Sequence, residues 1–395
     1  MDAHSYLSTN PWITFSYRAT VSPLWLALGE AFSKCQHLTG TPLMPAVAKN
    51  LASVYLVKGA LASTAIEGNT LSEEQAEEII IRGGRLPPSQ QYLAQEIENV
   101  VKAIRVIDAD VTSNATSHFQ ISTDWVRRQN RVVLADLETE PHVVPGEYTT
   151  SQLVVGRYRA APPEDVPYLM DRLADWLNEW LAPLRDPDLP PATRFCQSFF
   201  AATLGHLYLA WIHPFGDGNG RTARLLECAI LAHSGCVPLV AANLLSEHYN
   251  RTRTRYYQRL EDASKRGDVD GFLLYAAEGY TDLLREQIDR VQAMQRQIAW
   301  ESLIHSTLDD DPPGPTRERR LTLALAMPEN QAISRRQITE LTPGLARIYA
   351  GVGAKTVTRD LNRLVGLNLV RPVGRFLFTS NIASIDAFKP PVHSA

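Results

Sequence analysis

Two apolar runs of the chain are joined by the polar stretch His213-Pro214-Phe215-Gly216-Asp217-Gly218-Asn219-Gly220-Arg221-Thr222-Ala223-Arg224. Residues 199–212 before it and 224–231 after it carry apolar side chains at helical spacing, which predicts two buried helices with this loop between them. The glycines then lie just ahead of the second helix. Free backbone N–H groups and the positive end of the helix dipole attract anions at such a position.

The residue types of the loop favour a phosphate as that anion. Gly218 and Gly220 let the backbone approach a ligand without a Cβ atom in the way, and they permit positive φ. Arg221 and Arg224 are three residues apart, so both fall on one face of the following helix and can bind phosphate oxygens. His213, whose imidazole titrates near neutral pH, is a candidate general base.

Two other structures use similar residues. Asp-Gly and Asn-Gly pairs also form hairpin turns, but the flanking runs have helical length rather than the alternation of strands. A calcium loop needs oxygen ligands at alternate positions and a distal glutamate, and Arg221 breaks that pattern. The sequence therefore predicts a phosphate-binding site between two helices.

The composition is that of an ordinary globular protein of 395 residues, long enough for two or three domains, with a net charge of −4. The start of the chain lacks the basic and apolar regions of a signal peptide, and no apolar run approaches the length of a membrane span. The four cysteines form no CxxC pair, which favours reduced thiols over a zinc site or a disulfide framework. We therefore expect a cytoplasmic protein without a membrane partner.

The hydrophobic periodicity predicts a mainly α-helical chain in three parts. A polar break at residues 111–117 ends an N-terminal helical region, residues 1–112, and a core follows over residues 113–308. Clustered proline and glycine at residues 309–315 predict a linker to a C-terminal domain, residues 316–382.

Residues 213–224 resemble the signature of the Fic (filamentation-induced-by-cAMP) family, HxFx(D/E)GNGRxxR, at every specified position, and the likeness extends from about residue 55 to about residue 290. Fic proteins are mostly helical enzymes that typically transfer AMP from ATP to a protein hydroxyl, usually with magnesium. The resemblance implies a Fic-type helical core, protein adenylyltransferase activity, ATP as substrate and Mg²⁺ as cofactor.

The resemblance also assigns roles to individual residues. His213 would be the general base that takes the proton of a Ser, Thr or Tyr hydroxyl, and Asp217 would hold Mg²⁺. Arg221 would bind the β-phosphate and Arg224 the γ-phosphate. The nucleotide site as a whole would comprise Asp217, Gly218, Asn219, Gly220, Arg221, Thr222, Ala223, Arg224, Tyr256 and Tyr257.

Further features bear on the substrates. Residues 146–158 form a β-prone run bounded by glycines, which predicts a short hairpin similar to the family's flap, where a target protein adds a strand. Tyr256 and Tyr257 either line the adenine pocket or belong to the core of an amphipathic helix. Glycine at position 220, where the related phosphorylating Doc toxins carry lysine, favours nucleotidyl transfer. AMP removal, transfer of UMP or another phosphate-linked group, and phosphorylation stay open, as do modification of the chain itself and a homodimer.

An upstream segment, Ser63-Thr64-Ala65-Ile66-Glu67-Gly68-Asn69, resembles the Fic inhibitory motif, (S/T)xxxE(G/N). Ser63 and Glu67 lie one helical turn apart, and Gly68 predicts a left-handed cap just after Glu67. A carboxylate in the last turn opposes the helix dipole and needs a cationic partner, for which Arg224 is the candidate. That ion pair would occupy the guanidinium that the γ-phosphate needs, and so hold the activity low within the same chain.

The C-terminal part differs in charge. Residues 315–380 carry eleven Lys and Arg against four Asp and Glu, a surplus of +7 in a chain that is otherwise acidic. Helices are predicted near residues 321–326, 334–341 and 356–364, and a strand, a glycine turn and a strand follow over residues 369–378.

This order of elements resembles a winged helix-turn-helix. Lys355, Thr356, Thr358 and Arg359 would lie near the start of its recognition helix. Such domains bind DNA or dock proteins, and the sequence leaves both open. A DNA-binding regulator with a nucleotide-sensing Fic core is therefore the alternative function.

Overall fold

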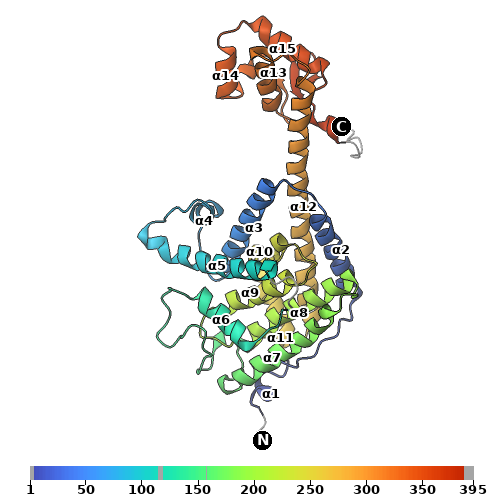
Figure 1. Ribbon diagram of the computed structural model, residues 1–395. Coiled ribbons are helices and arrows are strands. Elements are labelled where there is room, and N and C mark those ends of the chain that lie inside the picture. Colours follow the sequence, from blue (N-terminus) through green and yellow to red (C-terminus); the bar gives the residue numbers. More distant parts are fainter. Residues whose placement is uncertain (1–3, 114–118, 157, 387–395) are drawn as a thin grey trace. The chain divides into compact units, whose positions relative to one another are not determined.

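The computed structural model describes residues 4–113, 119–156 and 158–386, and most of them are helical (Figure 1). Most of the predicted polar break and Arg157 of the predicted flap lie outside the described residues. The chain divides into two compact units, residues 1–288 and 289–395, which are described one at a time. No helix within the described ranges has the length and low polarity needed to cross a bilayer.

The N-terminal unit is built from helices, with one small hairpin. Its helices are α1 (Tyr6–Thr9), α2 (Ser22–Thr39), α3 (Pro45–Ile66), α4 (Glu73–Ile80), α5 (Gln91–Ser113), α6 (Thr123–Val133), α7 (Val166–Leu181), α8 (Pro191–Ile212), α9 (Asn219–Ala232), α10 (Leu244–Arg251), α11 (Arg253–Lys265) and the first part of α12 (Val269–Leu308). The predicted mainly α-helical fold is thus confirmed.

The two helices predicted on either side of the polar loop, α8 and α9, form the centre of this unit. All residues of α9 but Gly220 are buried, as are those of α8 from Ser198 onward apart from Ala210, because α2 and α7 pack on α8 while α3, α5 and α6 pack on α9. Gly205 allows α7 and α9 to approach α8 closely. A Cβ atom at position 205 would lie 3.1 Å from Leu177 of α7 and 3.3 Å from Leu226 of α9. The loop between α8 and α9 is therefore held from both ends by rigid, packed helices.

The flap hairpin is shorter than predicted. Strands β1 (Val154–Val155) and β2 (Tyr158–Arg159) pair antiparallel, with Val155 opposite Tyr158. The first half of the 146–158 run is no strand, although Tyr148 bridges to Phe215 and the Thr149 N–H donates to the Pro214 carbonyl at 2.8 Å. These contacts tie that half of the run to the loop after α8, so it does not pair with the second half.

The C-terminal unit begins within α12, which continues up to Leu308. It contains α13 (Pro315–Ala326), β3 (Ile333–Ser334), α14 (Pro343–Tyr349), α15 (Ala354–Gly366), β4 (Val370–Val373) and β5 (Leu377–Ser380). The strands form an antiparallel sheet in the order β3-β5-β4. The helix predicted near residues 334–341 is wrong: a strand end and a 3-10 turn stand there, and α14 starts later, at Pro343, with the Thr342 hydroxyl capping its first turn.

Buried carboxylates neutralise part of the basic surplus of this unit. Asp360 on α15 is almost fully buried and accepts hydrogen bonds from the Nε of Arg319 and of Arg320 at 3.0 and 3.1 Å. It also accepts one from the Tyr349 hydroxyl at 3.2 Å. Asp311, from the predicted linker, is buried as well and pairs with Arg320 and Arg363. The linker segment thus packs in part within the C-terminal unit.

Replacing Asp360 by alanine should destabilise the C-terminal unit by about 3–5 kcal/mol, because two partly buried guanidinium groups lose their shared counter-charge. Calorimetric melting of the full chain would register this as a lower transition temperature for one unit. Glu318→Ala, which removes an exposed carboxylate from the same unit, is the matched control. Equal melting curves for the two variants would contradict the structural role of Asp360.

Candidate active site

The backbone reverses sharply between α8 and α9. His213 ends α8 in the left-handed conformation, with φ 52° and ψ 59°, and its N–H donates to the Leu209 carbonyl. Gly218 precedes α9 with φ 76°, and a Cβ atom there would lie 2.9 Å from the Asn130 side chain. Only glycine fits position 218 without strain. The same reason for a glycine there follows from the sequence, because glycine permits positive φ.

Several polar side chains of the loop are used to hold its shape. Asn219 forms two hydrogen bonds with the backbone of Phe215, at 2.9 and 2.6 Å, and the Thr222 hydroxyl donates to the Gly218 carbonyl. Ala223 is fully buried. The side chains of Asn219 and Thr222 are therefore used within the loop, and the first backbone N–H groups of α9 are the groups of this segment that a helix leaves without an internal partner.

A second brace comes from Asn130 on α6, which is fully buried. Its amide group donates to the Asp217 carbonyl at 2.9 Å and accepts from the Gly146 N–H at 2.9 Å. One side chain therefore fixes both the loop and the start of the flap segment. The sequence offered no signal for Asn130, because its partners lie far along the chain.

Arg224 on α9 is clamped by the predicted inhibitory motif. Its Nε donates to the Ser63 hydroxyl at 3.0 Å, and its Nη2 donates to the Ser63 carbonyl at 2.8 Å and to Glu67 Oε1 at 2.7 Å. The guanidinium is 1% exposed, so these groups are its immediate surroundings. The predicted contact between Glu67 and Arg224 is present.

Glu67 stands at the C-terminal end of α3, followed by Gly68 with φ 111°. Burial acts to raise the pKa of its carboxyl, but the neighbouring Arg224 guanidinium outweighs this and holds the pKa below its usual value. The carboxylate lies directly over Gly220, since a Cβ atom at that position would come within 2.2 Å of Oε1. Gly220 thus leaves room for the Glu67 carboxylate.

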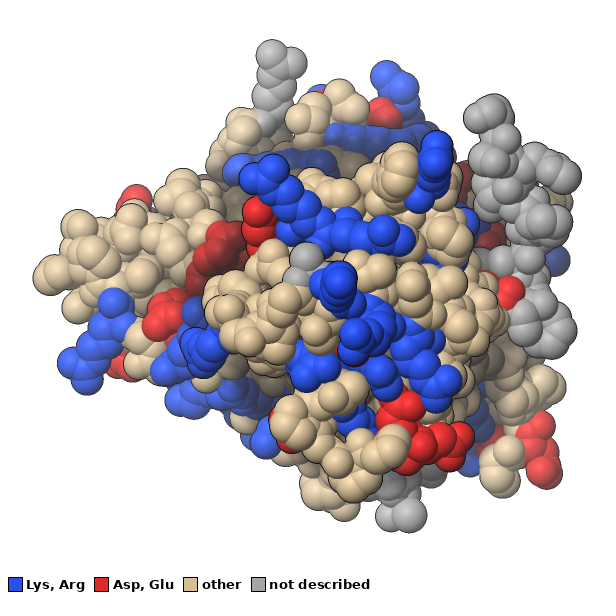
Figure 2. Space-filling view, turned by 90° about the horizontal axis from the view of Figure 1, so that it is seen from above, with Lys and Arg blue, Asp and Glu red and all other residues tan. Residues whose placement is uncertain are grey.

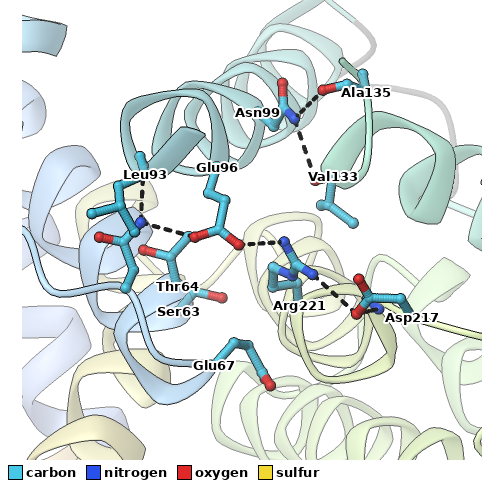
Figure 3. Close-up of polar contacts among 12 residues, drawn as sticks. Ser63, Thr64, Glu67, Leu93, Glu96, Asn99, Val133, Ala135, Asp217 and Arg221 are labelled. Atoms are coloured by element: carbon cyan, nitrogen blue, oxygen red, sulfur yellow. Dashed lines mark hydrogen bonds and ion pairs between the residues drawn. The ribbon is translucent and has the colours of Figure 1, made fainter. Parts of the chain in front are cut away.

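Arg221 is held by a separate carboxylate, Glu96 of α5 (Figure 3). Its two terminal nitrogens donate to Glu96 Oε1 at 3.1 Å and to Asp217 Oδ1 at 3.2 Å. The other oxygen of Glu96 accepts from the side chain of Asn69, two residues after Glu67. The end of the inhibitory segment is thereby connected to Arg221 through Glu96, a residue that the sequence reasoning missed.

His213 lies at the other side of the loop. Burial lowers the pKa of its imidazole, although the Ala210 carbonyl and the nearby Glu67 and Asp217 carboxylates act in the opposite direction. Nδ1 lies 3.4 Å from the Ala210 carbonyl, which can only accept a hydrogen bond, so the proton belongs on Nδ1. Nε2 then carries the lone pair, as a general base requires.

The pocket next to these groups has a volume of about 470 Å³. It brings together residues of the signature loop, the inhibitory motif, the flap and α11, and its lining includes Glu67, Val155, Tyr158, His213, Gly220, Arg224, Tyr256, Tyr257, Leu260 and Lys265. Asp217, Asn219 and Arg221 are not part of this lining. The volume is within the range of small-molecule sites.

The two tyrosines of α11 differ in their surroundings. Tyr256 is buried, and its hydroxyl lies 2.8 Å from His206 Nε2, while His206 Nδ1 lies 3.2 Å from Glu227. Tyr257 is 44% exposed at the pocket edge. Each tyrosine thus lines the pocket, and Tyr256 also belongs to a buried polar network; that the pocket binds adenine stays a prediction.

The comparisons with known proteins agree with this site. The sequence profile of the Fic/DOC family matches residues 120–231, which include the whole signature loop. The chain contains a Fic/DOC domain. The inhibitory motif and Glu96 lie outside the matched range, so their placement against the Fic domain comes from the structure alone.

Relatives of the Fic domain carry names that describe one activity. The chain is 32% identical over 219 residues to protein adenylyltransferase fic-1 of Caenorhabditis briggsae, and 31% identical over 251 residues to that of Caenorhabditis elegans. These matches cover 55% and 64% of this chain but 38% and 43% of the relatives. The chain thus spans less than half the length of these curated relatives.

Solved structures share the fold. A Fic family protein from Desulfovibrio desulfuricans G20 matches with a TM-score of 0.53 and 20% identity, over 92% of this chain and 98% of that one. Fic-1 (residues 134–508) from C. elegans matches with a TM-score of 0.51 and 24% identity, over 68% and 72% of the two chains. The Fic-type helical fold is therefore shared beyond the profile match.

Asn130→Ala should lower the free energy of unfolding by about 2 kcal/mol, because the buried Gly146 N–H loses its acceptor and the Asp217 carbonyl loses its donor. Urea denaturation followed by circular dichroism measures this. Arg128→Ala, an exposed position on the same helix, should change the midpoint little. If the urea midpoint of Asn130→Ala is as high as that of Arg128→Ala, the hydrogen bonds of Asn130 are not needed for stability.

Proposed function

We propose that the chain is a protein adenylyltransferase that transfers AMP from ATP to a hydroxyl of a target protein, with its activity held low by Glu67. The observation that carries this proposal is the meeting of three groups at one pocket: the candidate base His213, the helix start at Gly220, and Arg224 clamped by Ser63 and Glu67. The names of the relatives support the reaction, and the contacts of Glu67 support the inhibition.

In this reaction the His213 Nε2 takes the proton of the target hydroxyl while the hydroxyl oxygen attacks the α-phosphorus of ATP. The new bond joins that oxygen to phosphorus, and the bond to the β-phosphate breaks, so pyrophosphate leaves. The N–H groups at the start of α9 and Arg221 would stabilise the negative charge that moves toward the leaving group. The lowered pKa of His213 keeps it neutral, and hence able to accept a proton, at physiological pH.

Asp217 is suited to holding Mg²⁺. Its side chain is half exposed, Oδ1 accepts from Gly218 and Arg221, and Oδ2 makes no hydrogen bond within the described part of the chain. One carboxylate together with substrate phosphates is a common ligand set for this ion. When bound, Mg²⁺ would neutralise part of the phosphate charge.

The inhibition follows from competition for one guanidinium. Arg224 cannot donate the same N–H groups to Glu67 and to a γ-phosphate, so ATP meets a site whose γ-phosphate position is already filled by a carboxylate.

A target protein would dock on the flap by pairing with its exposed β1 strand, where Val154 and Val155 are solvent-accessible.

Glu67→Gly should raise the rate of AMP transfer at least about tenfold, because Arg224 becomes available to the nucleotide. The measurement is label retained on protein from α-labelled ATP, with γ-labelled ATP in parallel. Glu98→Ala, which removes an exposed carboxylate on α5, serves as the charge control and should leave the rate unchanged.

In the same assay, the double variant Glu67→Gly/His213→Ala should retain no label, since it lacks the base. Equal labelling of parent and Glu67→Gly would remove the inhibitory role of Glu67. Label retained from the γ-position rather than the α-position would indicate phosphorylation and would contradict AMP transfer.

The pH dependence of the Glu67→Gly variant offers a further test. The rate should fall on the acid side as His213 becomes protonated, and the midpoint should lie below the ordinary imidazole pKa of about 6.5, because burial lowers the pKa of this group. Removing Glu67 also removes a carboxylate that raises this pKa, which moves the midpoint further down. A midpoint above the ordinary value would contradict the assignment of His213 as the base.

A further inference from the structure

The basic residues of the C-terminal unit fall into two sets. Arg319, Arg320 and Arg363 are used in ion pairs with the buried Asp311 and Asp360, and Arg317 pairs with Asp309. The second set is exposed and makes no ion pair within the described residues; it comprises Arg335, Arg336, Arg347, Lys355, Arg359, Arg371 and Arg375. We call this second set the basic face.

The basic face is concentrated on the elements that a winged helix presents to a ligand. Arg335 and Arg336 directly follow β3, Lys355 and Arg359 stand in the first turns of α15, and Arg371 and Arg375 belong to the β4–β5 hairpin. Figure 2, which looks onto the C-terminal unit, displays Lys and Arg side chains in bands with few carboxylates among them. Within residues 315–380, the exposed acids are Glu318, Glu329 and Glu340, of which Glu329 pairs with Arg296.

Helix α15 has one buried side and one free side. Val357, Leu361 and Leu364 pack into the core of the unit, whereas Lys355, Arg359 and Asn362 are exposed. The helix begins after Gly353 without a side-chain cap, so its first N–H groups remain available to an anion. A helix with this distribution can lie in a major groove, with its first turns against the bases and phosphates.

The β4–β5 hairpin supplies a second, separate contact. It turns at Gly374, whose φ is 65°, and exposes Phe376 by 62% of its surface. The Arg375 guanidinium lies 5.2 Å from the centre of the Phe376 ring. An arginine beside an exposed aromatic side chain at a hairpin tip can contact the DNA backbone next to the groove that the helix occupies.

From this arrangement we infer that the C-terminal unit binds double-stranded DNA, with α15 in the major groove and the β4–β5 hairpin on the adjacent backbone. The exposed positive charges occur on two elements of one compact unit, a helix and a hairpin, and both kinds of element contact the phosphate backbone in protein–DNA complexes. This function is independent of nucleotide transfer by the Fic domain, and its test does not depend on that activity.

The test measures fluorescence anisotropy of a labelled mixed-sequence duplex of about three helical turns with the full chain, between about 50 and 200 mM salt. The logarithm of the binding constant should fall linearly with the logarithm of the salt concentration, by about 0.9 for each phosphate contact. Lys355→Gln/Arg359→Gln and Arg371→Gln/Arg375→Gln should each reduce that slope by about 2.

The matched control is Lys102→Gln/Arg105→Gln, which removes two exposed charges from α5 and should leave the slope unchanged. Calorimetric melting of each variant checks that the C-terminal unit stays folded. The inference is overturned if the parent does not bind the duplex at low salt, or if the control lowers the slope as much as the two test variants. It is also overturned if poly-glutamate binds the full chain as tightly as DNA does, since the basic face would then bind acidic proteins in general.

Discussion

The contact between Arg224 and the end of α3 is the interaction on which the site depends. A buried guanidinium requires an anion, and removing its only counter-charge costs about 3–5 kcal/mol. In this chain the anion is Glu67, supported by the hydroxyl and carbonyl of Ser63. In the function proposed above, a γ-phosphate would bind the same guanidinium, so Glu67 and the nucleotide would compete for Arg224.

Other contacts hold the surroundings of Arg224 in place. Most of α8 and nearly all of α9 are buried, and Asn130 and Asn219 fix the loop between them. What can change is the position of the Glu67 side chain, which is about one third exposed. Glu96 extends the connection, because it contacts both Asn69 and Arg221. Movement of the end of α3 would therefore reach both arginines of the loop.

The sequence was sufficient for those parts of the site that depend on local spacing. The helix–loop–helix and the need for glycine at 218 follow from helical periodicity and φ preferences, whereas the partnership of Glu67 with Arg224 was expected from the resemblance to the Fic inhibitory motif. Glu96 and Asn130 could not be found in this way, because their partners are distant in sequence and are set by packing. The correct start of the helix that was predicted at 334–341 could have been found from the sequence, since Thr342 and Pro343 are residue types typical of a helix start. The surplus of +7 over residues 315–380 already includes Asp360, but it leaves out Asp311, whose ion pairs with Arg320 and Arg363 are set by packing.

The most direct test of the account compares the binding of ADP and of a non-hydrolysable ATP analogue to the parent and to Glu67→Gly by titration calorimetry. If Glu67 occupies the γ-phosphate position, the parent should bind both nucleotides with similar affinity. The variant should then prefer the ATP analogue by about tenfold or more, the value of a charge-assisted contact to Arg224. The same ratio of affinities in both proteins would contradict the claim that Glu67 and the γ-phosphate compete for Arg224.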